Sequence, residues 1–134
     1  MAKLGKDFAF TGVYQCKVVD VYDGDSLRLA FKWKGDIIQW QARMMHYDAP
    51  EMKPRKDLLN REAHIIVARE AKQLLIDTIG KSMVMAKMHG FDKYGRILVT
   101  LDIDDWARQN VYVNGVMMNS GLVKPYEGGT KEAF

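Results

Sequence analysis

The strict alternation of residue types from Asp25 to Trp33 restricts the fold of this chain more than any other feature. Every second position carries an apolar side chain or one aspartate, in the order Asp25, Leu27, Leu29, Phe31 and Trp33, with small or charged residues between them. A period of two residues is typical of a β-strand with one buried face. The sequence therefore predicts a half-buried strand whose buried face carries an aspartate at one end.

A turn and a partner strand are expected directly after this segment. Lys34-Gly35-Asp36 is a turn signal, and the residues that follow it are rich in β-branched and aromatic side chains. This order favours an antiparallel hairpin. A register with Trp33 opposite Ile38 places Asp25 opposite His46.

The open end of this hairpin gathers two acidic side chains. Asp48 lies on the partner strand roughly 7 Å beyond the residue opposite Asp25. Pro50 stops the ladder there, because proline has no backbone N–H to donate. An acidic pair at the end of a sheet is costly unless a cation neutralises it. We therefore predict a metal site at this end of the hairpin.

The donors at this predicted metal site are all oxygen atoms. Glu51 adds a third carboxylate beside Asp25 and Asp48, and the bend before Pro50 could turn the carbonyl of Ala49 inward. Such donors favour a hard cation, Ca²⁺ first, with Mg²⁺ or Mn²⁺ as alternatives. The competing interpretation is that the two aspartates only cap turns, but the register brings them together and favours the metal.

Two arginines are candidates for binding an anion beside this cation. Arg43 lies on the opposite face of the predicted strand from Asp48, so a bulge or twist is needed to bring both to one site. Arg96 directly follows the turn Asp92-Lys93-Tyr94-Gly95. The guanidinium fork matches the oxygen atoms of a phosphodiester. The alternative is that each arginine pairs with a surface carboxylate.

The rest of the pattern predicts an α+β, mostly β fold. Apolar residues recur at helical spacing from an N-cap at Asn60 to a stop at Gly80, which indicates one long helix. Five strands with this helix between the third and the fourth suit a five-stranded OB-type Greek-key barrel with one or two short helices. The further expected segments are strands over residues 10–21, 82–91 and 96–102, an acidic loop over 102–105 and a short helix over 110–120.

Length and charge limit the other function classes. The chain has 134 residues and a formal net charge of +3, which suits one domain but does not establish a polyanionic partner. No apolar run reaches membrane-spanning length, and the first ten residues lack the hydrophobic region of a secretory signal. We therefore expect a cytoplasmic monomer without membrane contact, with a flexible tail over residues 1–8 and a mobile loop over 52–59.

Four separated motifs occur in order along the chain. They are Asp23-Gly24-Asp25-Ser26; Arg43 followed by Asp48-Ala49-Pro50-Glu51; Asp92-Lys93-Tyr94-Gly95-Arg96; and Val113-Asn114 followed by Gly121-Leu122-Val123. This series, from about residue 13 to residue 129, resembles the staphylococcal nuclease (thermonuclease) family, in particular its compact bacterial or phage-type members. The resemblance implies a single nuclease-like domain over residues 1–134, in a bacterial cytoplasm or a phage-infected host.

The resemblance also implies a chemistry and a metal site. It implies a Ca²⁺-dependent phosphodiesterase that acts on DNA and RNA and leaves 3′-phosphate ends. Asp25, Asp48 and the carbonyl of Ala49 resemble the family's metal ligands, although Ala49 stands where a threonine is common. Glu51 resembles the glutamate that holds or deprotonates the attacking water.

The remaining matched positions resemble substrate contacts. Arg43 and Arg96 are similar to the pair that grips the scissile phosphate, and Lys93 and Tyr94 match positions that contact a terminal phosphate of the nucleotide. The family's aromatic pair beside the base is represented here at most by Tyr126.

A second function class stays open beside the enzyme. It is a catalytically silent OB-fold module that binds nucleic acid or protein. The complete set of Asp25, Arg43, Asp48, Glu51 and Arg96 favours the enzyme, because a binding module has no physical reason to keep these residues together. A barrel that binds single strands by stacking is disfavoured, since the strands lack a row of exposed aromatic residues. The choice of DNA or RNA and of endo- or exonuclease action stays open.

Overall fold

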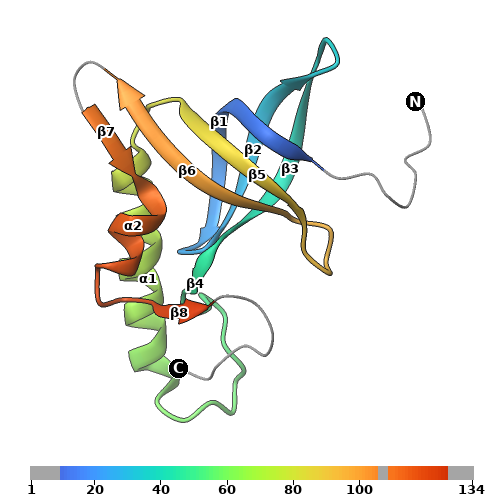
Figure 1. Ribbon diagram of the computed structural model, residues 1–134. Coiled ribbons are helices and arrows are strands. Elements are labelled where there is room, and N and C mark those ends of the chain that lie inside the picture. Colours follow the sequence, from blue (N-terminus) through green and yellow to red (C-terminus); the bar gives the residue numbers. More distant parts are fainter. Residues whose placement is uncertain (1–9, 106–108, 127–134) are drawn as a thin grey trace.

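The structure, a computed structural model, describes residues 10–105 and 109–126. Within these residues, strands dominate and two helices lie together beside them (Figure 1). The elements are β1 (Thr11–Asp23), β2 (Ser26–Trp33), β3 (Asp36–Met44), β4 (His46–Asp48), α1 (Arg61–Ile79), β5 (Val84–Phe91), β6 (Ile97–Asp105), β7 (Gln109–Tyr112), α2 (Val113–Met118) and β8 (Lys124–Tyr126).

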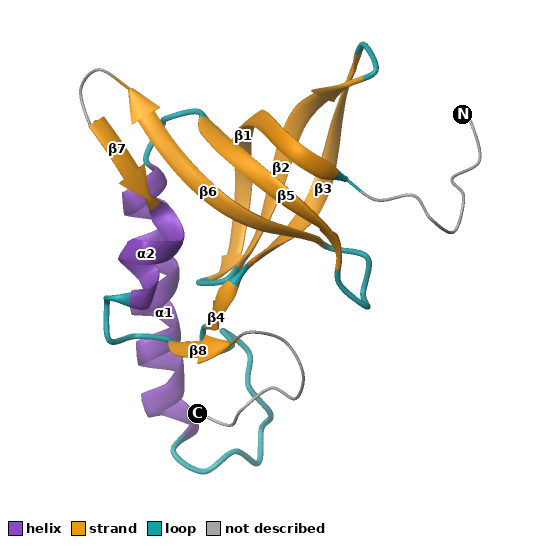
Figure 2. Ribbon diagram, in the orientation of Figure 1, coloured by secondary structure: helices purple, strands orange, loops and turns teal. Residues whose placement is uncertain are grey.

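Five of the strands close into a barrel. The order along the sheet is β3-β2-β1-β5-β6-β7, with antiparallel pairing between neighbours, and a parallel pairing of β3 with β6 closes the barrel. β7 extends the sheet beyond β6, while β4 and β8 form a separate two-stranded sheet near the end of β3 (Figure 2). The prediction of a mostly β, OB-type five-stranded barrel with one long helix and one or two short helices is confirmed, with α2 as the short helix within the described residues.

The β2–β3 hairpin has a tighter turn than the sequence predicted. Trp33 pairs with Asp36, and Ile38 pairs with Phe31 two positions away from the expected partner. The loop contains only Lys34 (φ 50°) and a glycine with φ 87°, and two consecutive positive φ values are typical of a two-residue hairpin turn. The predicted register was therefore wrong by two residues.

This register error leaves the buried face of the hairpin unchanged, because side chains alternate with a period of two. Leu27, Leu29 and Phe31 are buried as predicted. The partner of Asp25 does change: its carbonyl accepts a hydrogen bond of 2.9 Å from the backbone N–H of Met44 and does not face His46. The acidic end of the hairpin is still the end that meets β4.

The long helix α1 packs directly against the turn that precedes Asp25. Its observed bounds agree with the prediction, but Asn60 makes no side-chain capping bond and instead has a left-handed backbone (φ 60°). A Cβ added at Gly24 would lie 2.9 Å from the Cβ of Ala71 on the helix and 3.0 Å from that of Ala49. Only glycine therefore allows this close approach between helix and turn.

Two predictions in the second half of the chain were wrong. Residues 102–105 do not form a loop, because β6 continues to Asp105, and the short helix starts at Val113 rather than at residue 110. The cause is the pairing of β6 with β7, in which Ile103 lies opposite Val111. A partner strand can override local preference, because it satisfies the backbone hydrogen bonds of both segments.

Two further expectations concern irregular segments. The predicted tail over residues 1–8 lies outside the described residues. Residues 52–59 contain no helix or strand, and the mobility of this segment stays a prediction. Within the described residues, no helix combines the length and apolar character needed to cross a membrane.

Candidate active site

A sharp bend between β3 and β4 brings Arg43 and Asp48 to the same pocket. β3 ends at Met44, β4 begins at His46, and His46 has a left-handed backbone with φ 81°. The bend breaks the two-residue alternation, so that both side chains are buried, with exposed fractions of 7% for Arg43 and 1% for Asp48. It supplies the irregularity that the sequence pattern required.

The amide of Asn114 holds this bend against β6. Its Oδ1 accepts a hydrogen bond of 2.8 Å from the N–H of Leu101, and its Nδ2 donates to the carbonyls of Met45 (3.0 Å) and Val99 (3.2 Å). The residue is fully buried at the start of α2. Asn114 therefore connects the bend to the barrel wall, although it does not line the pocket.

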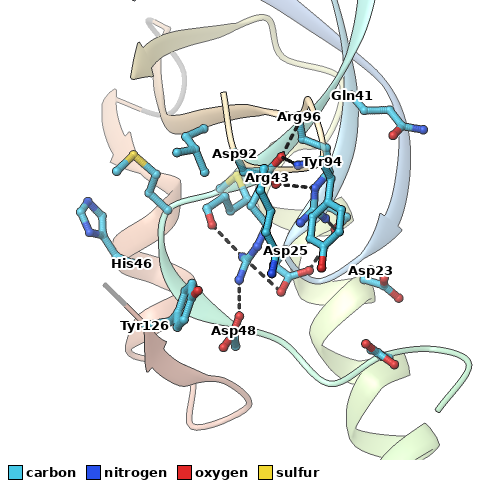
Figure 3. A pocket seen from close by; sticks show the side chains of 16 residues that line it. Asp23, Asp25, Gln41, Arg43, His46, Asp48, Asp92, Tyr94, Arg96 and Tyr126 are labelled. Atoms are coloured by element: carbon cyan, nitrogen blue, oxygen red, sulfur yellow. Dashed lines mark hydrogen bonds and ion pairs between the residues drawn. The ribbon is translucent and has the colours of Figure 1, made fainter. Parts of the chain in front are cut away.

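The guanidinium of Arg43 lies between the two predicted metal carboxylates (Figure 3). Its Nη1 is 3.2 Å from Oδ2 of Asp25, and its Nη2 donates a hydrogen bond to Oδ1 of Asp48. The same Nη1 donates to the backbone carbonyls of Met44 and Tyr47, both at 2.8 Å. Arg43 thus acts as the counter-ion of the acidic pair and as a brace for the bend.

Asp25 is positioned by two hydrogen bonds to its carboxylate and by one to the residue before it. Its Oδ2 accepts a hydrogen bond of 2.9 Å from the N–H of Ala49, and its Oδ1 accepts one of 3.1 Å from the hydroxyl of Ser26. The phenol of Tyr47 donates a bond of 2.7 Å to the carbonyl of Gly24, the residue before Asp25. Burial raises the pKa of Tyr47 well above its ordinary value, and the charge of Asp25 adds to this, so the phenol stays protonated.

Arg96 is fixed on the other side of the pocket by Asp92. Oδ1 of Asp92 accepts the backbone N–H groups of Tyr94 and Arg96, each at 2.9 Å, and Oδ2 accepts Nε of Arg96 at 2.7 Å. Nη1 of Arg96 reaches the hydroxyl of Ser26 at 3.3 Å, and the same hydroxyl bonds to Asp25. Ser26 therefore links the arginine to the acidic pair.

Aromatic rings flank both arginines. The guanidinium of Arg96 lies 5.5 Å from the ring centroid of Tyr94, and Nζ of Lys93 lies 5.1 Å from the same ring. The guanidinium of Arg43 lies 5.5 Å from the ring of Tyr126 on β8. These distances are within the range of cation–π attraction. Figure 3 shows the two tyrosines on opposite sides of Arg43.

One open pocket of about 960 Å³ contains nearly all the side chains that the sequence selected. Glu51 lines it from an exposed position after β4. The predicted residues that line it are Asp25, Arg43, Asp48, Glu51, Lys93, Tyr94, Arg96 and Tyr126. Ala49 is buried and is not among the lining residues, and its backbone N–H donates to Oδ2 of Asp25.

The donor chemistry of this pocket fits a hard cation, but Arg43 already forms ion pairs with both carboxylates. Asp25 and Asp48 are buried carboxylates, and such oxygen donors suit Ca²⁺. Among the described residues, no group of three or more histidine, cysteine, aspartate or glutamate side chains is arranged to hold a metal ion. Arg43 takes up oxygen atoms that an ion would use.

Sequence reasoning assigned no role to several residues that build the site. Ser26, Asp92 and Asn114 stood in the recognised motifs, and an aspartate at the start of a turn is a known signal for side-chain bonding to the turn backbone. Tyr47 carried no such signal. Its importance follows from a contact to Gly24, which is distant in the sequence.

A comparison with known protein families identifies the family of this chain. A family model described as staphylococcal nuclease homologue matches residues 41–133, well over half of the chain. The match begins after Asp25 and includes Arg43, Asp48, Glu51 and Arg96. A search of curated proteins found no match. The chain belongs to the staphylococcal nuclease homologue family, and this membership indicates a nuclease-like function that acts on nucleic acid.

Proposed function

We propose that this protein is a Ca²⁺-dependent phosphodiesterase that hydrolyses DNA, with RNA as a second substrate, and leaves 3′-phosphate ends. The observation that carries the proposal is the convergence of two buried carboxylates, one exposed carboxylate and two arginines on a single pocket. The arginines come from β3 and from the turn before β6, so the fold has assembled the set from distant segments. The products and the metal follow the family resemblance.

Each side chain has a distinct task in the proposed reaction. Asp25 and Asp48, with a carbonyl contribution from Ala49, would hold the cation, which supplies Lewis-acid stabilisation of charge on the phosphate when bound. Arg96 faces the pocket in a fixed orientation, because Asp92 holds its backbone and its Nε. A preorganised guanidinium can stabilise a phosphate transition state without further reorganisation.

Glu51 is the proposed general base. It lines the pocket from an exposed position, where a water molecule can reach it. A carboxylate in that position can orient the attacking water and accept its proton, which typically contributes about 10²–10⁴-fold to the rate. Lys93, Tyr94 and Tyr126 line the pocket and would bind the nucleotide through its phosphate and its rings.

The test is cleavage of single-stranded DNA with and without Ca²⁺, with wild type compared with Asp25→Asn. Asp25→Asn keeps the shape of the side chain and removes the charge that would hold the cation. Asp77→Asn on the exposed side of α1 is the matched control, since its carboxylate bonds only to Gln73 among the contacts described. We expect Ca²⁺-dependent cleavage that Asp25→Asn loses and Asp77→Asn retains. Cleavage that survives in Asp25→Asn and in excess chelator would contradict the proposal.

The ion pairs of Arg43 favour one second candidate. A pocket whose two buried acids are both already paired with an arginine could serve as a binding site that does not cleave. This catalytically silent module would retain nucleic acid in a gel-shift experiment, with steep salt dependence, while leaving the strand intact at every Ca²⁺ concentration. The products of the cleavage experiment therefore separate the two functions.

A further inference from the structure

Arg43 has an unusually complete set of partners for an arginine in a proposed substrate pocket. Its Nη1 donates to the carbonyls of Met44 and Tyr47 at 2.8 Å each and lies 3.2 Å from Asp25, while its Nη2 bonds to Asp48. The side chain of Arg43 is only 9% exposed. The guanidinium is therefore held inside the wall of the pocket and is not a mobile surface group.

The two carboxylates need this positive charge. The side chains of Asp25 and Asp48 are 7% and 1% exposed, and buried carboxylates without a counter-ion are strongly unfavourable. Arg43 brings the formal charge of the three side chains from −2 to −1. A divalent cation at the same carboxylates would bring it to +1, with the ion and the guanidinium repelling each other at short range.

We propose that Arg43 competes with the divalent cation for the carboxylates of Asp25 and Asp48 and thereby keeps the cation affinity of the pocket low. The inference rests on the proposed function for the identity of the cation site. It assigns to Arg43 a second role beside phosphate binding, as the residue that sets how much Ca²⁺ the pocket requires. The backbone carbonyls that anchor Nη1 keep the competitor in place, so the cation cannot simply displace it into solvent.

Arg96 provides a matched comparison within the same pocket. It has the same charge and lines the same cavity, but its ion pair is with Asp92, at 2.7 Å. Among the described residues, its hydrogen-bonded link to Asp25 is the hydroxyl of Ser26. Removal of Arg96 changes the electrostatic potential of the pocket, whereas removal of Arg43 also removes a direct competitor for the oxygen atoms of the acidic pair.

The experiment measures Ca²⁺ binding by calorimetry, without nucleic acid, for wild type, Arg43→Gln, Arg43→Lys and Arg96→Gln. We expect Arg43→Gln to bind Ca²⁺ about tenfold or more tightly than wild type, with a smaller gain for Arg96→Gln. Arg43→Lys should also bind more tightly than wild type, since one ammonium group cannot reproduce the guanidinium fork. If Arg43→Gln does not fold without the ion, Arg43→Lys, which keeps a positive charge, provides the comparison with wild type.

A second measurement gives an independent answer. Without Ca²⁺, the Arg43 variants should have a lower melting temperature than wild type. Added Ca²⁺ should raise their melting temperature more than it raises that of wild type or Arg96→Gln, because the ion replaces the missing counter-ion. The inference is overturned if neither wild type nor the Arg43 variants bind Ca²⁺, or if the Arg43 variants bind it no more tightly than Arg96→Gln does. Both measurements are made without nucleic acid, so they are independent of the cleavage experiment. If the protein shows the expected Ca²⁺ affinities but does not cleave DNA, only the proposed function is wrong. If it cleaves DNA but lacks this pattern of affinities, only this inference is wrong.

Discussion

The phenol of Tyr47 donates a hydrogen bond of 2.7 Å to the carbonyl of Gly24, across a gap of 23 residues in the sequence. Tyr47 directly precedes Asp48, and Gly24 directly precedes Asp25. One buried hydrogen bond therefore fixes the distance between the two segments that carry the acidic pair. The carbonyl of Tyr47 also accepts from Arg43, so the same residue positions all three charges.

Tyr47→Phe tests this connection. The substitution keeps the ring and leaves the buried carbonyl of Gly24 without its donor, which should lower the free energy of unfolding by about 1–3 kcal/mol. Urea unfolding measures this loss, and Ca²⁺ affinity should fall with it because the two carboxylates are no longer held together. Tyr94→Phe is the control, since Tyr94 is 72% exposed. Equal stability of the two variants would show that the bond has no such effect.

Asn114→Ala should destabilise the bend that unites the site. The change leaves the N–H of Leu101 and the carbonyls of Met45 and Val99 without their side-chain partner. We expect a loss of about 3 kcal/mol in chemical unfolding, because buried polar groups without partners are costly. The exposed Asn119→Ala, just after α2, should stay within about 0.5 kcal/mol of wild type. A small effect at Asn114 would mean that the bend is held by other contacts.

Asp92 should act on catalysis through Arg96. Asp92→Ala removes the acceptor that fixes the arginine, and we expect kcat on single-stranded DNA to fall about tenfold or more. The double variant Asp92→Ala with Arg96→Ala should be no slower than Arg96→Ala alone, because both changes remove the same interaction. Asp36→Ala, at the exposed start of β3, is the control. Strictly additive losses would indicate separate roles.

The relative cost of removing each charged group tests the electrostatic account. Arg96→Ala and Asp25→Ala should lower kcat more than Glu51→Gln does, because stabilisation of the phosphate charge is expected to exceed the contribution of the general base. Single-turnover cleavage measures the chemical step directly. If all three variants cleave at nearly the wild-type rate, the proposed mechanism is wrong.

Stability at high pH should depend on Cys16. Burial raises the pKa of this thiol from 9.0 to about 12. Above pH 9 the unfolded chain loses this proton while the folded chain keeps it, so the thiol's contribution to stability, complete below pH 9, is lost as pH rises. The free energy of unfolding should therefore fall by about 1.4 kcal/mol per pH unit up to about pH 12.

Cys16→Ala isolates this contribution. The variant should be less stable than wild type at pH 8, because it leaves a cavity, but its unfolding free energy should fall less steeply above pH 9. Urea unfolding from pH 8 to pH 11 gives both curves. Parallel curves over the whole range would show that the thiol does not titrate differently in the two states.

The elements of the fold could be predicted wherever the signal was local. The alternation from Asp25 to Trp33 and the helical spacing before Gly80 both depend on neighbours within a few residues. The hairpin register was missed because it depends on the positive φ of Lys34, which a sequence pattern does not contain. The strand at Gln109–Tyr112 was missed because β6, its partner, satisfies its backbone hydrogen bonds.

The amino-acid sequence alone determined which residue types the site would contain: carboxylates, arginines and tyrosines in ordered motifs beside a half-buried strand. Only the tertiary structure decided that Arg43 lies between Asp25 and Asp48, because that arrangement requires the left-handed backbone of His46 and the brace from Asn114. Local patterns fix which face of a strand is buried. The distances between charges depend on contacts between segments that are far apart in the chain, and these form only when the barrel closes.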